Sequence, residues 1–134
     1  MSENFYARKT EILQARWKKV QELTEVFNDS TGNDGLVAIA YLEKGLFAKS
    51  HVGHINFFRP GNANSIHVQG VVTDNRLVST TPLLDYDAFV AGKAIRVILE
   101  ESGLSEEYQA KTVRPTNELA DRSVQFILLP AEYE

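Results

Sequence analysis

The stretch "NFYARKTEILQARWKKVQELTEVF", residues 4–27, predicts a long amphipathic helix because its apolar residues recur at helical spacing. Ser2 or Asn4 can cap its start, and the polar run 28–32 ends it. A stripe of this size either covers a sheet or pairs with a second copy of the chain, and we expect it to cover a sheet. The stripe consists of Tyr6, Leu13, Trp17, Val20, Leu23 and Phe27.

Four β-favouring segments follow this helix and predict a strand meander. Gly53 interrupts the second segment, which predicts a bulge or bend there. Asp74-Asn75 predicts a two-residue hairpin turn, since both residue types tolerate positive φ. The four expected strands are 36–42, 46–58, 65–73 and 76–80.

A second helix is expected from Pro82 to Ser102. Thr81 is its expected N-cap, and Gly103 is its expected C-cap. Asp85 and Asp87 stand near its positive end, where acidic residues stabilise a helix. Gly92 is expected to allow close packing, and the expected buried side consists of Phe89, Val90, Ala94, Val97 and Ile98.

Two closing strands are expected at 108–113 and 123–129. The resulting order is α-β-β-β-β-α-β-β, without an internal repeat or a long linker. We therefore expect a single α+β domain over 1–134, with a mainly antiparallel sheet of about six strands and two helices on one face.

The three histidines fall within residues 51–70, "HVGHINFFRPGNANSIHVQG". His51 and His54 are three apart, so on a strand they point to opposite faces, and their spacing is a poor metal signal. The turn at 59–64 predicts a hairpin between 46–58 and 65–73. In that hairpin the non-core face gathers polar side chains, and the candidate binding residues are His54, Asn56, Arg59, His67 and Gln69.

The composition excludes several classes of function. The chain has no cysteine, which excludes disulfides, thiolate nucleophiles and cysteine-bound zinc. Residues 85–134 carry five basic and ten acidic groups of a chain whose net charge is −4, which argues against binding a phosphate backbone. No apolar run approaches the ~18 residues of a membrane span, and no secretory signal is evident, so a cytoplasmic protein is expected. We expect no bound metal and no cofactor.

The order of elements, the size and the acidic C-terminal end resemble those of the small phage tail-terminator, or tail-completion, proteins. The closing strand 123–129 also looks like theirs. This resemblance implies a ring-forming component located in a virion.

The missing catalytic motifs favour a non-enzyme, and they predict an interaction or assembly protein that acts through its surface as a homo-oligomer. Strands 46–58 and 109–113 are expected to leave edges for pairing between subunits. The alternative is a small-molecule-binding or inhibitor protein that uses the polar hairpin face.

Overall fold

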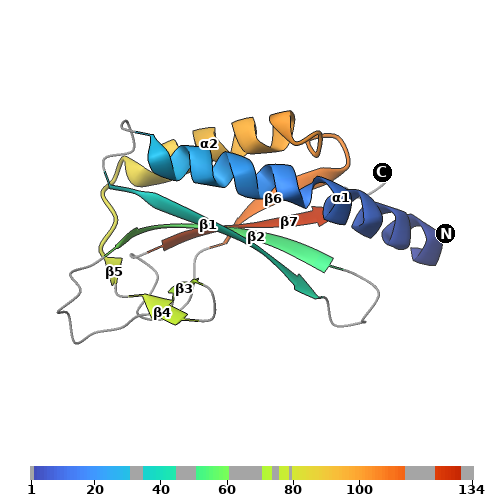
Figure 1. Cartoon of the computed structure of the whole chain (residues 1–134), viewed down its shortest axis with the longest axis horizontal. Coiled ribbons are helices and arrows are strands. Elements are labelled where there is room, and N and C mark those ends of the chain that lie inside the picture. Colours follow the sequence, from blue (N-terminus) through green and yellow to red (C-terminus); the bar gives the residue numbers. More distant parts are fainter. Residues whose placement is uncertain are drawn as a thin grey trace.

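The computed structural model describes residues 2–30, 35–44, 51–60, 71–73, 76–78, 80–113 and 123–130. It confirms the α+β class and shows two helices (Figure 1). The elements in chain order are α1 (Ser2–Asp29), β1 (Val37–Lys44), β2 (His51–Pro60), β3 (Val71–Thr73), β4 (Arg76–Val78), β5 (Thr80–Thr81), α2 (Asp87–Glu101), β6 (Tyr108–Val113) and β7 (Ser123–Pro130).

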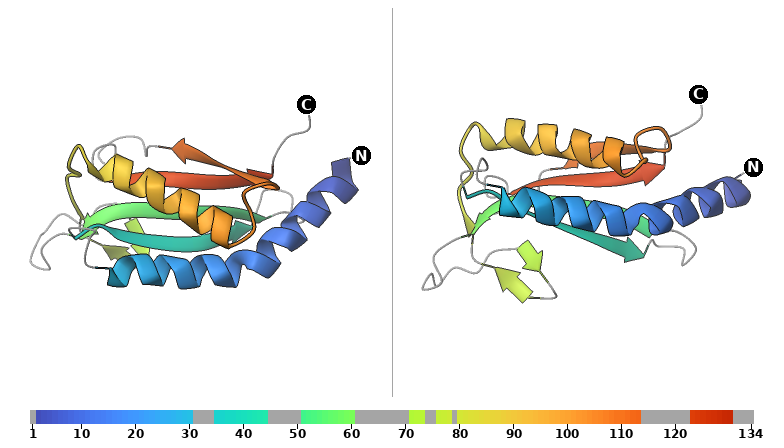
Figure 2. Two further views of the ribbon diagram at one scale, coloured as in Figure 1. Left: turned by 90° about the horizontal axis from the view of Figure 1, so that it is seen from above. Right: turned by 45° about the horizontal axis from the view of Figure 1, so that its top comes forward.

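The main sheet contains four antiparallel strands in the order β1-β2-β7-β6, and the short β5 pairs with the end of β2. The strands β3 and β4 form a separate two-stranded antiparallel sheet, in which Thr73 pairs with Arg76. The expected sheet of about six strands is therefore not confirmed. The expected turn at 74–75 lies outside the described residues. The short strands lie on the side of the main sheet away from the helices (Figures 1 and 2).

Both helices cover one face of the main sheet, as Figure 2 shows from two directions. The long apolar stripe of α1 thus covers a sheet, as expected, with Leu13 and Val20 fully buried and Phe27 half-buried. The side chain of Tyr6 lies outside the described residues. The sheet contributes alternate residues to this core, mainly Ala38, Ile55, Phe57, Tyr108, Val124, Phe126 and Leu128.

Gly53 lies in the middle of this packed layer and is not a bulge. It pairs regularly with Leu42 on one side and with Leu128 on the other. A Cβ atom at Gly53 would lie 2.6 Å from Cζ3 of Trp17, which is closer than any real contact. The glycine is therefore present because the indole ring of α1 packs directly on the backbone of β2.

The helix α2 begins at Asp87, five residues after the expected start at Pro82. The preceding residues form a turn, in which the backbone N–H of Asp87 donates to the carbonyl of Leu84 at 3.0 Å. The Asp87 carboxylate accepts the N–H of Leu84 in return, at 2.6 Å. This reciprocal pair satisfies both backbone groups of Leu84 in a turn, without a helix at 82–86.

The other end of α2 confirms the expected role of Gly103, which has a φ of 73°. The N–H of Gly103 donates to the carbonyl of Glu100, and the N–H of Leu104 donates to that of Leu99. These two bonds are the Schellman arrangement. Leu99 and Leu104 are both buried, which supplies the apolar contact that accompanies the motif.

The buried side of α2 is the expected one only in part: Ile98 is buried and Val90 and Ala94 pack against the core as expected. Its buried apolar residues are Ala91, Ile95, Ile98 and Leu99. Phe89 and Val97 were expected in the core, but they are 57% and 49% exposed. Gly92 makes no close approach, since a Cβ atom there would meet nothing within 4 Å.

Two glycine substitutions test this packing. Gly53→Ala should lower the free energy of unfolding by about 1–3 kcal/mol, because the new methyl group displaces Trp17. Gly92→Ala adds the same atom in open space within a helix, so it should raise that free energy by up to about 1 kcal/mol. Urea denaturation of both variants measures the two effects. Equal effects at the two positions would contradict the packing described here.

Candidate functional site

Of the five residues that the sequence placed in one binding surface, the structure describes three and separates Arg59 from the other two. His54 and Asn56 lie on the open face of the main sheet, meaning the face away from the helices, as expected from their alternation with Ile55 and Phe57. Arg59 faces the other way, toward the start of α2. His67 and Gln69 lie outside the described residues.

The expected hairpin between 46–58 and 65–73 is wrong for residues 53–58. Those residues pair with β1 on one side and with β7 on the other, so no edge remains for another strand. Within 65–73 the described part is β3, which pairs with β4. The physical reason is that β7, more than sixty residues further along the chain, supplies a long apolar partner that covers the second edge of β2.

On the open face, side chains from three strands surround the imidazole of His54. The ring of Tyr41 stacks on it with centroids 4.8 Å apart and an interplanar angle of 5°. Nε2 of His54 lies 2.9 Å from Oε2 of Glu43, and Nδ1 lies 3.2 Å from Nε2 of Gln125. The amide of Gln125 also donates to the hydroxyl of Tyr41 at 3.3 Å. The side chain of Asn56 is a further hydrogen-bond partner of Tyr41. We call Tyr41, Glu43, His54, Asn56 and Gln125 the His54 cluster.

The hydrogen bonds of the His54 cluster assign one tautomer to the imidazole. Because the atom of Gln125 that faces Nδ1 is the amide nitrogen, which can only donate, Nδ1 of His54 accepts and Nε2 carries the proton toward Glu43. Burial lowers the pKa of His54, and the nearby Glu43 carboxylate opposes that shift only in part. Burial likewise raises the pKa of Tyr41. The cluster is therefore held with a neutral imidazole and a protonated phenol at neutral pH.

This geometry makes the His54 cluster a cross-strand connection. The two ring nitrogens of His54 contact Gln125 and Glu43, and the residue as a whole is 8% exposed. Among the described residues, no three His, Asp or Glu side chains come together as a metal site would require. The contacts join β1, β2 and β7, while His51 lies on the helix side with Gln14.

The lowered pKa of His54 predicts a pH dependence of stability. Below the ordinary value of 6.5, the unfolded chain binds a proton at this position before the folded chain does. The free energy of unfolding should therefore fall as the pH decreases from 6.5, and His54→Gln should make that decrease shallower. Chemical denaturation between pH 8 and pH 5 measures both slopes, and pH 8 is the internal control. Identical slopes in the two proteins would contradict the assignment.

Arg59 forms a buried ion pair with Asp87 instead of joining the His54 cluster. Nε donates to Oδ2 at 2.7 Å and Nη2 donates to Oδ1 at 2.8 Å, which is the bidentate geometry. The guanidinium and the N–H of Leu84 together hold the pKa of Asp87 below its usual range. The pair connects the end of β2 to the start of α2.

Removing one partner of this pair should be costly. Arg59→Met leaves the Asp87 carboxylate, which is 3% exposed, without its counter-ion, so the free energy of unfolding should fall by about 3 kcal/mol. Asp85→Asn is the control, because Asp85 is exposed and its change should stay within about 0.5 kcal/mol. Thermal or urea unfolding checks both values. An Arg59→Met protein as stable as the parent would exclude a supporting role for the pair.

The outer edges of the main sheet belong to β1 and β6, and a side chain of α1 contacts the edge of β1. On β1, the side chain of Asn28 donates to the carbonyl of Ala38 at 2.8 Å and accepts its N–H at 2.7 Å, so it occupies that edge at Ala38. Within the described residues β6 pairs with β7 alone, so the expectation of an edge strand at 109–113 is met. The expectation for 46–58 is wrong for 53–58, which are central.

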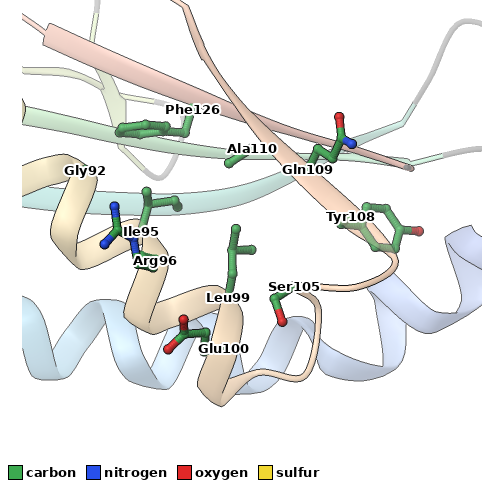
Figure 3. A pocket seen from close by; sticks show the side chains of 10 residues that line it. All are labelled: Gly92, Ile95, Arg96, Leu99, Glu100, Ser105, Tyr108, Gln109, Ala110 and Phe126. Atoms are coloured by element: carbon green, nitrogen blue, oxygen red, sulfur yellow. The ribbon is translucent and has the colours of Figure 1, made fainter. Parts of the chain in front are cut away.

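A shallow groove of about 490 Å³ runs between α2 and β6 (Figure 3). Ile95 and Leu99 of α2 point toward the strands, where Ala110 and Phe126 form the other wall. Its polar lining consists of Arg96, Glu100, Ser105, Tyr108 and Gln109. The lining is chemically mixed and contains no grouped charge of one sign.

A second groove, of about 440 Å³, lies between α1 and α2 on the outer side of the helices. Val26 and Val97 line it and are 63% and 49% exposed. Sequence reasoning missed this surface because it assigned Val97 to the core. The signal was available in part, since Ala91, Ile95 and Ile98 already make a complete helical stripe without Val97.

Comparison of the chain with protein-family models, with curated proteins and with solved structures finds no match in any of the three. The resemblance to phage tail-terminator proteins therefore remains a prediction. Neither helix in the described ranges combines the length and apolarity needed to cross a bilayer.

Proposed function

We propose that this chain is a non-catalytic assembly protein that self-associates through the outer face of its helical layer. The observation that carries the proposal is the position of its exposed large apolar side chains. In the described part of the chain all of them lie on the helices or on the turn leading into α2: Val26, Leu84, Tyr86, Phe89 and Val97.

These side chains form linked groups. The rings of Tyr86 and Phe89 are 5.5 Å apart, and the ammonium of Lys93 lies 5.3 Å from the centroid of Phe89. Lys93 in turn lines the outer groove that Val26 and Val97 share. A surface that joins half-exposed aromatic and aliphatic groups in this way is typical of protein–protein contacts.

Two other surfaces offer fewer unpartnered groups to a binding partner, which indirectly favours binding through the helices. Both ring nitrogens of His54 already have partners within the His54 cluster, and Asn28 occupies the edge of β1 at Ala38. The resemblance to tail-terminator proteins supports a narrower version of the proposal, in which the assembled protein is a component of a virion.

Substitution of the exposed ring tests the proposal. Burying a phenylalanine contributes roughly 1.5–3 kcal/mol, so Phe89→Ser should weaken self-association about tenfold or more. Gln109→Ser, at an exposed position on the β6 edge, should leave association unchanged. Light scattering over a range of concentrations measures the mass. A parent protein that stays monomeric at high concentration would overturn the proposal.

A further inference from the structure

One row of α2 carries a defined order of apolar and charged side chains. Phe89, Lys93, Val97 and Glu101 are four residues apart in succession, so they follow one another along the same side of the helix. All four are exposed. At 1.5 Å per residue, Lys93 and Glu101 lie about 6 Å along the axis on either side of Val97.

Lys93 and Glu101 lack an ionic partner within the described part of the chain. The ammonium of Lys93 lies over the ring of Phe89, and both charged residues line the outer groove between the helices. The groove therefore has an apolar floor with one positive and one negative group placed symmetrically about Val97. Its apolar lining includes Leu23, Phe27, Val90, Ala94 and Ile98.

This arrangement is complementary to itself. When two copies of α2 cross antiparallel about a two-fold axis at Val97, positions equally far from Val97 on opposite sides face each other. Lys93 of each copy then faces Glu101 of the other, which gives two opposite-charge contacts. A parallel alignment would instead set Lys93 beside Lys93 and Glu101 beside Glu101, which is repulsive.

We infer that the occupant of this surface is a second copy of the chain, bound antiparallel through α2 with Val97 at the two-fold axis. The apolar groove receives side chains of the partner copy, and the two Lys93–Glu101 contacts fix the direction of the helices. The inference rests on the proposed function and specifies its partner, its symmetry and its contact residues.

Charge reversal tests the geometry directly. Lys93→Glu makes both positions acidic, and Glu101→Lys makes both basic, so each variant alone should dimerise at least tenfold more weakly than the parent. An equal mixture of the two variants should form a heterodimer close to the parent in affinity, because each acidic position then faces a basic one. The combined Lys93→Glu/Glu101→Lys variant should likewise recover dimerisation.

Analytical ultracentrifugation of the purified full chain, alone and in mixtures, gives the dissociation constants. Lys111→Glu, the same charge change on the exposed β6 edge, is the matched control and should leave the dimer unchanged. A monomeric parent protein would overturn both the proposed function and this inference. An assembly of more than two copies, single variants that still dimerise, or dissociation by Lys111→Glu would overturn the inference alone.

Discussion

The fold depends on the contact between the indole of Trp17 and the backbone of Gly53. With no side chain at position 53, α1 lies closer to the sheet than any other residue type would allow. This contact assigns one face of β2 to the helices and places Ile55 and Phe57, two and four residues further along the strand, in the core. His54 and Asn56 are consequently turned to the open face.

Polar contacts then fix the ends of the helices against the sheet. Arg59 and Asp87 connect β2 with the start of α2, and Asn28 connects the end of α1 with β1. Arg16 donates to the carbonyl of Gly103 beyond the end of α2. Buried or half-buried polar groups need hydrogen-bond partners, and these side chains find theirs in neighbouring elements of the fold. Their contacts therefore stabilise the fold.

The outer face of the helical layer differs from these supported regions. Phe89 and Val97 contribute little to the core, yet they keep large apolar surfaces in contact with solvent. Lys93 and Glu101 accompany them in a fixed order along α2. The proposed association with a second copy would bury these apolar groups and pair these charges.

The sequence by itself determined the α+β class, the long helix of the first thirty residues, both closing strands and the opposite orientation of His51 and His54. These features depend on local periodicity and on turn residues, which short windows contain. Only the tertiary structure decided that β7 pairs with β2, that Gly53 accommodates Trp17, and that Arg59 pairs with Asp87. Each of those contacts joins residues distant in the chain. The packing of α2 on α1 and β7 likewise decided which of its apolar residues stayed outside.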